Sequence, residues 1–144
     1  MQRILLTFLL ALASAIAMTD EATNILDRYI NAYNDRDIDA VMSTMADSIR
    51  WMAVDGDELA VRADGRTAVR ESLENGFTLL PSARSRLLQT QTMGDFVSTI
   101  EEVTWNAGDG TTKTQCAMAV YQLTDGLIAN VWYFAAQACP APGA

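Results

Sequence analysis

The stretch VYQLTDGLIANVWYF, residues 120–134, decides the fold because it has the pattern of a complete β-hairpin. Its two arms are rich in residues that favour strands, and the dipeptide at 125–126 between them is typical of a tight turn. Further strand-forming segments precede it at 85–93, 95–105 and 112–123, and the last arm extends to residue 135. Because short turns join neighbouring antiparallel strands, these segments predict an antiparallel meander.

The sequence does not decide the pairing register of the last hairpin. A two-residue turn at 125–126 pairs Ala119 with Trp132, whereas a three-residue turn with a glycine bulge pairs Ala119 with Val131. Trp132 and Tyr133 lie on opposite faces of the strand, so the register decides which of the two rings faces the interior.

The N-terminal half has the patterns of helices and of one small hairpin. Apolar and aromatic residues at helical spacing, turn residues and caps predict the following elements: a helix over 22–34, a short helix with Asp37 as its N-cap, strands at 48–54 and 59–63, and a helix over 67–75 that Gly76 terminates. This order predicts a single-domain α+β protein with its helices packed on one face of a sheet.

The first seventeen residues have the pattern of a secretory signal peptide. Arg3 is followed by an apolar run over 4–13 and by the small-x-small sequence AIA at 15–17. The alternative is a retained membrane anchor, but the apolar run is short for a bilayer span. The sequence thus predicts a secreted or periplasmic protein, with the domain over 18–136 and a tail over 137–144.

Composition excludes several classes of function. The chain has 10 basic and 18 acidic residues, a formal net charge of −8 and no histidine. Its only lysine is Lys113, so nucleic acid and anionic membrane surfaces are repelled. Without histidine, the usual zinc site and the usual catalytic triad lose their commonest members, and no phosphate-binding or dinucleotide glycine motif is present. We expect no metal and no cofactor, nor a membrane partner after signal removal.

Cys116 and Cys139 are the only two cysteines. An exported protein is expected to join them in a disulfide. With a two-residue turn, however, Cys116 lies opposite Ala135, and a straight strand would leave the two cysteine Cα atoms roughly 13 Å apart. A disulfide requires about 7 Å or less, so the bridge forms only if residues 136–139 leave the strand and curl back.

Three stretches resemble the nuclear transport factor 2-like superfamily, also called SnoaL-like or ketosteroid-isomerase-like. They are RYINAYNDRDIDAVMSTMADSIRW (28–51), DGRTAVRESL (64–73) and the hairpin at 120–134. The resemblance implies a cone, in which a strongly curved antiparallel sheet wraps around N-terminal helices and encloses a hydrophobic pocket. It also implies a homodimer joined through the sheet.

The catalytic residues of that superfamily carry over only in part. Its isomerase member uses an aspartate base together with a tyrosine and a protonated aspartic acid in an oxyanion hole. The tyrosine falls on Tyr29, but the base falls on Ala53 and the protonated acid falls near Ala119. Asp55, two residues beyond Ala53, is the candidate for a displaced base.

Glu101 and Glu102 are adjacent in a predicted strand, so they point to opposite faces. The resemblance assigns Glu102 to the pocket, together with Ser98, Ile100 and Thr104. We therefore expect Glu102 to be the more buried of the pair, with a raised pKa suited to proton transfer. A one-residue slip would reverse the assignment. Alternatively, Glu102 reaches the pocket mouth or pairs with an arginine such as Arg62 or Arg86.

The opposite face of the same strand would then be the outer face of the sheet. It carries Val97, Thr99, Glu101, Val103 and Trp105. Val97, Thr99, Val103 and Trp105 would form an apolar patch large enough to need covering, which fits a homodimer.

The remaining aromatic residues suggest what the pocket holds. Tyr33, Trp51, Tyr121 and Trp132 are candidate ligand-binding residues, although rings at these spacings are equally typical of a core. We expect an exported protein that binds a small hydrophobic molecule. The first alternative is an isomerase or dehydratase that uses Glu102 or Asp55 with Tyr29, and the second is a dimeric interaction module without a useful pocket.

Overall fold

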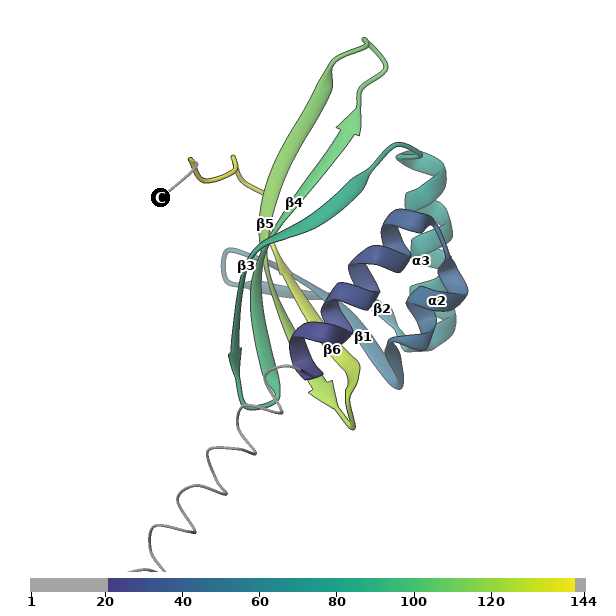
Figure 1. Ribbon diagram of the computed structural model, residues 1–144, viewed down its shortest axis with the longest axis vertical. Helices are drawn as coiled ribbons and strands as arrows, with labels where there is room; N and C mark the ends of the chain where they lie inside the picture. The colour runs from purple at the N-terminus through teal and green to yellow at the C-terminus, as the bar shows by residue number, and fades with distance from the viewer. Residues whose placement is uncertain (1–20, 142–144) are drawn as a thin grey trace, which may run out of the picture.

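The computed structural model describes residues 21–141 and shows one six-stranded sheet with helices on one side (Figure 1). The strands are β1 (Met45–Asp55), β2 (Glu58–Asp64), β3 (Arg84–Met93), β4 (Phe96–Asn106), β5 (Thr112–Thr124) and β6 (Leu127–Phe134). Their order in the sheet is β2-β1-β6-β5-β4-β3. The meander from β3 to β6 is antiparallel, as predicted, whereas β1 joins β6 in parallel.

The helices are the N-terminal helix (residues 21–35), α2 (Ile38–Ser43) and α3 (Gly65–Leu79). Asp37 is the N-cap of α2, as predicted, and its side chain accepts a hydrogen bond from the Ala40 amide at 2.9 Å. The prediction that Gly76 terminates α3 is wrong, because the helix continues to Leu79. Phe77, just beyond Gly76, packs edge-on against Tyr33 with ring centroids 5.1 Å apart. This tertiary contact supports the last turn of the helix.

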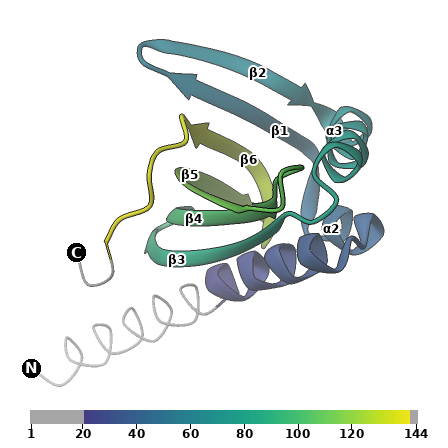
Figure 2. The same ribbon diagram turned by 90° about the horizontal axis from the view of Figure 1, so that it is seen from above.

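The sheet curves around the helices without closing. Figure 2 shows β1 and β2 diverging from the other strands, with α3 beside them and the N-terminal helix beside β3. The core lies between helix and sheet, where Leu26 of the N-terminal helix and Val97, Tyr121 and Val131 of the sheet are fully buried. The chain therefore has the predicted single-domain α+β fold.

The last hairpin adopts neither of the two registers considered above. Asp125 and Gly126 form a two-residue turn with positive φ at both positions, 52° and 73°. The register then shifts, because Leu123 pairs with Ile128 but Gln122 pairs with Asn130. The extra residue, Ala129, is a β-bulge. Ala119 consequently pairs with Tyr133, and this pairing decides which aromatic side chains face the helices.

The signal peptide expected at 1–17 lies outside the described residues. Within residues 21–141, no helix is long and apolar enough to cross a membrane. Export stays a prediction from the sequence pattern.

Candidate functional site

A cavity of about 370 Å³ lies between the N-terminal helix and the concave face of the sheet. Most of its lining is apolar or aromatic and comes from Tyr29, Ile30, Tyr33, Trp51, Met52 and Val103. The lining residues also bring polar groups: the side chains of Arg62, Ser85 and Glu101 and the hydroxyls of Tyr29, Tyr33 and Tyr133. The site is therefore an apolar chamber with a few polar groups at defined places, which is the usual construction of a small-molecule site.

The structure reverses the predicted orientation of the glutamate pair. Glu101 is only 6% exposed and lines the cavity. Glu102 lies on the opposite face, where its Oε1 atom accepts a hydrogen bond from Arg86 Nε at 2.6 Å. The prediction that Glu102 enters the pocket is therefore wrong, and the alternative pairing with Arg86 is the one observed. This ion pair holds the pKa of Glu102 below its usual range.

The sequence of β4 itself indicates the correct orientation of Glu101 and Glu102, which the family resemblance did not. Val97 and Thr99 are buried and Val103 lines the cavity, and all three share a face with Glu101. The more apolar and β-branched set of alternating residues is the one that faces the interior of a half-buried strand.

Glu101 stands at one end of a chain of hydroxyl groups. Its Oε1 atom accepts a hydrogen bond from Thr99 Oγ1 at 3.2 Å and another from the hydroxyl of Tyr121. The Tyr121 hydroxyl lies 3.3 Å from that of Tyr133, which lies 3.1 Å from that of Tyr29. The chain thus runs from the carboxyl on β4, through β5 and β6, to the N-terminal helix.

Burial sets the proton affinity of these groups. It raises the pKa of the Glu101 carboxyl, while the hydrogen bonds from Tyr121 and Thr99 oppose that rise. Burial also raises the pKa of Tyr29 and Tyr121, and the nearby Glu101 charge adds to the rise. The pKa of Tyr133 is raised by burial first, then by Tyr29 and Glu101. These phenols therefore stay protonated, and Glu101 holds its proton to a higher pH than an exposed glutamate.

Three of the predicted site residues line the cavity: Tyr29, Tyr33 and Trp51. Tyr121 is fully buried and acts through its hydrogen bond to Glu101 rather than as part of the lining. Tyr29, Tyr33 and Trp51 therefore lie at the predicted aromatic chamber next to the helix, and their roles in binding or catalysis stay predictions.

Two other predicted site residues lie elsewhere. Trp132 is on the convex face near Phe96, with ring centroids 6.4 Å apart, because the bulge turns Tyr133 toward the cavity instead. Asp55 is exposed at the end of β1 and pairs with Glu58 across the turn. Neither residue contributes to the cavity, so their predicted roles are wrong.

The outer-face patch predicted for dimerisation is also wrong in its residues. Val97 and Thr99 are buried on the concave side. The convex face instead exposes Met93, Phe96 and Met118, which keep 78%, 41% and 40% of their surface accessible.

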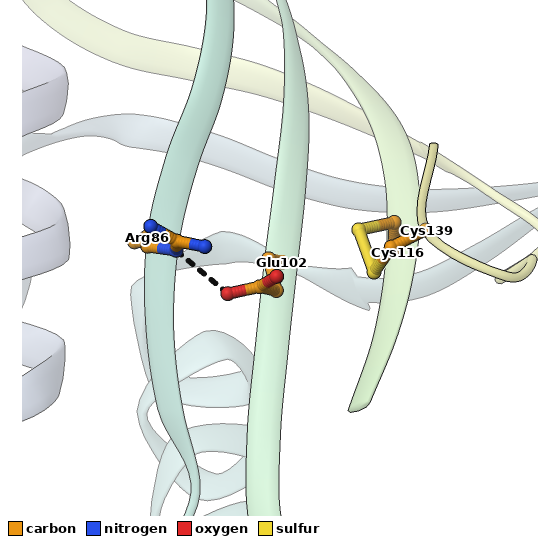
Figure 3. Close-up of a disulfide and its surroundings, with 4 residues drawn as sticks. All are labelled: Arg86, Glu102, Cys116 and Cys139. Carbon is orange, nitrogen blue, oxygen red and sulfur yellow. Dashed lines mark hydrogen bonds and ion pairs between the residues drawn. A yellow bond between two sulfur atoms is a disulfide. The ribbon is translucent and has the colours of Figure 1, made fainter. Parts of the chain in front are cut away.

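Cys116 and Cys139 are joined in a disulfide whose Cα atoms are 4.8 Å apart. The tail leaves β6 after Phe134 and returns to β5, where Cys116 and Gln137 exchange two backbone hydrogen bonds of 3.0 and 2.7 Å. Figure 3 shows Glu102 between Arg86 and the disulfide. Glu102 and the two sulfurs are close enough to suggest metal ligands, but the sulfurs are bonded to each other.

Helices packed on a curved, open sheet, with a cavity between the two layers, define the class of protein. The family model of the SnoaL-like domain matches residues 26–131, so the chain belongs to this family.

Similar solved structures support the same fold. TerC co-crystallised with polyporic acid is 21% identical with a TM-score of 0.68, over 78% of this chain and 89% of that chain. An uncharacterised cystatin-fold protein from Novosphingobium aromaticivorans is 24% identical with a TM-score of 0.67, over 78% and 96%. An NTF2-like protein from Burkholderia pseudomallei is 15% identical with a TM-score of 0.66, over 78% and 88%. A comparison with curated protein sequences found no significant match.

Proposed function

We propose that this protein binds a small, largely apolar molecule in the cavity between the N-terminal helix and the sheet. The observation that carries the proposal is an apolar chamber of about 370 Å³ with a buried carboxyl, Glu101, in its wall. A buried carboxyl in the wall of a mostly apolar pocket is a common feature of binding and active sites. The similar structure of TerC was crystallised with polyporic acid, which is consistent with a chamber that takes small molecules in this fold.

Unused hydrogen-bonding capacity at the cavity supports the same proposal. Trp51 Nε1 and Ser85 Oγ belong to lining residues, are buried, and have no hydrogen-bond partner within residues 21–141. Buried polar atoms are nearly always paired in native proteins, so an unpaired set beside a cavity favours a bound partner.

A fluorescent probe tests whether the cavity binds ligands. N-phenyl-1-naphthylamine is neutral and apolar, and its emission rises on transfer to an apolar site. We expect the wild-type protein to bind it and Ala53→Trp, which fills the cavity wall, to weaken binding by about tenfold or more, the equivalent of one poorly accommodated group. Ala136→Trp places the same ring on the exposed tail and is the matched control. Equal binding by all three proteins would refute a ligand-binding cavity.

A second function, proton transfer of the isomerase or dehydratase type, is favoured by the buried carboxyl itself. Glu101 would move the proton, and the hydroxyl of Tyr29 or Tyr133 would donate a hydrogen bond to a carbonyl oxygen of the substrate. In this role Glu101 replaces Glu102 and Asp55, which the fold places outside the cavity.

The conversion of 3-cyclohexen-1-one to its conjugated isomer measures this activity by ultraviolet absorbance. Glu101 would remove a proton from the carbon between the carbonyl group and the double bond and return it to the far alkene carbon. We expect Glu101→Gln to lower the rate by about 100-fold or more while probe affinity stays within about tenfold. Glu102→Gln, on the opposite face, is the control and should change neither. A wild-type rate equal to the buffer rate would leave binding as the function.

A further inference from the structure

Arg62 is the one cationic side chain among the described residues that line the cavity. Three other arginines form ion pairs with acidic side chains: Arg66 with Asp47, Arg70 with Asp39 and Arg86 with Glu102. No carboxylate within residues 21–141 forms an ion pair with Arg62. A guanidinium without a carboxylate beside a mostly apolar chamber is therefore available to a ligand.

The backbone of β2 places Arg62 at the cavity. Met52 pairs with Val61 and Trp51 pairs with Ala63, so Arg62 is an extra residue without a partner in the register. Such a β-bulge bends the strand and changes where a side chain points. Here Ala63 stays in the hydrophobic core while Arg62, its neighbour, lines the cavity. The bulge thus brings two successive residues to the same side of the strand.

Arg62 places a positive charge at the cavity of a protein that is otherwise strongly acidic. The chain carries a formal net charge of −8, so its surface as a whole repels anions. Glu101 is the only acidic residue in the cavity lining that the structure describes, and its raised pKa reduces the negative charge it presents there. An anion that reaches the chamber therefore meets one positive group and little opposing charge.

We infer that the natural ligand is a small aromatic or alicyclic acid whose anionic group pairs with Arg62 while its apolar body lies among Tyr29, Tyr33 and Trp51. The inference rests on the proposed binding function and adds the charge of the ligand. A guanidinium binds a carboxylate through two parallel hydrogen bonds. Arg62 would therefore fix the orientation of the ligand, with its acidic group next to β2. A polar group at the opposite end of the molecule then faces Glu101.

Two probes with the same ring system test the inference. 8-Anilinonaphthalene-1-sulfonate carries a sulfonate, and N-phenyl-1-naphthylamine is its neutral counterpart. We expect the wild-type protein to bind the sulfonate more tightly than the neutral probe at low salt. Arg62→Ala should weaken sulfonate binding by about tenfold, the loss of one charge-assisted hydrogen bond, and leave neutral binding within about twofold. Lys113→Ala removes the same charge from the exposed start of β5 and should change neither affinity.

The outcomes separate this inference from the function on which it rests. A sulfonate preference that survives in Arg62→Ala, or the same loss for both probes, would overturn the role of Arg62. Arg62→Glu, which reverses the charge on an exposed edge strand, should abolish sulfonate binding and retain the neutral probe. If Ala53→Trp leaves the binding of both probes unchanged, the binding function itself fails.

Discussion

Burial of Glu101 makes the free energy of unfolding depend on pH. The pKa of this carboxyl is raised above its ordinary value of 4.5, so the folded protein keeps a proton that the unfolded chain has lost. The resulting stabilisation is complete below about pH 4.5 and is lost as the pH rises through the folded-state pKa, at no more than about 1.4 kcal/mol per pH unit. Glu101→Gln, which keeps the shape and does not titrate, should remove this fall. Urea unfolding at a series of pH values measures it.

Glu102→Gln is the control for this prediction because its pKa is shifted in the opposite direction. Its ion pair with Arg86 stabilises above pH 4.5 and is lost as the pH falls, so this variant should change only the acid side of the profile. An unchanged alkaline slope in Glu101→Gln would contradict the assignment to Glu101.

Tyr133 connects the hydroxyl chain, and removing its oxygen should separate the two ends. Tyr133→Phe leaves the hydroxyl of Tyr29 without its partner at 3.1 Å and removes the 3.3 Å contact to Tyr121. We expect a loss of about 1–2 kcal/mol in the free energy of unfolding. Tyr33→Phe is the matched control, since the structure gives its hydroxyl no hydrogen bond within residues 21–141. Equal effects of the two substitutions on the free energy of unfolding would show that the hydrogen bonds between these hydroxyl groups add no stability.

For single residues of the cavity, the sequence predicted which residue types line it better than it predicted which way each strand side chain points. Tyr29, Tyr33 and Trp51 follow from a helical stripe and an apolar strand, and both patterns persist in the fold. The positions of Glu101 and Tyr133 depend on strand parity, which one residue of misalignment or one bulge inverts. The contrast between Val97 and Ser98 was the local signal that favoured the correct parity.

The turn between β5 and β6 depends on the backbone freedom of Gly126. Its φ of 73° is strained for any residue with a Cβ atom, and a Cβ there would lie 3.0 Å from Glu21 Oε1. Gly126→Ala should therefore destabilise the protein by about 1 kcal/mol. Gly76→Ala has open space and helical backbone in α3, so it should stabilise by about 0.5–1 kcal/mol. Thermal unfolding of the pair checks both signs, and a stabilising Gly126→Ala would refute the strain.

Helices, strands and turns were predictable from the sequence where neighbouring residues determine them. Strand-forming runs, the N-cap at Asp37 and the turn at 125–126 all have the expected structure. The end of α3 and the bulges at Arg62 and Ala129 were not predictable, because they follow from contacts between distant segments. Phe77 on Tyr33 extends the helix, and the pairing of β6 with both β1 and β5 selects the register.

For the whole molecule, we propose a homodimer that covers the convex face of the sheet. Met93, Phe96 and Met118 are exposed there, and large apolar surfaces of this kind mark interaction sites. Sedimentation at micromolar concentration should show a dimer, and Met118→Asp should dissociate it. Leu79→Asp changes an apolar and even more exposed residue of α3 and should leave the dimer intact. A monomeric wild-type protein would contradict the proposal.

The parallel join between β1 and β6 has a consequence for how the chain is made. β1 ends at Asp55 and its neighbour β6 begins only at Leu127, so the sheet cannot be completed until nearly the whole polypeptide has emerged from the ribosome. At roughly 5–20 residues per second, the early segments wait for several seconds or longer with an unpaired edge. During that interval the sheet stays incomplete, which suits passage through a translocation pore of the kind that the first seventeen residues predict.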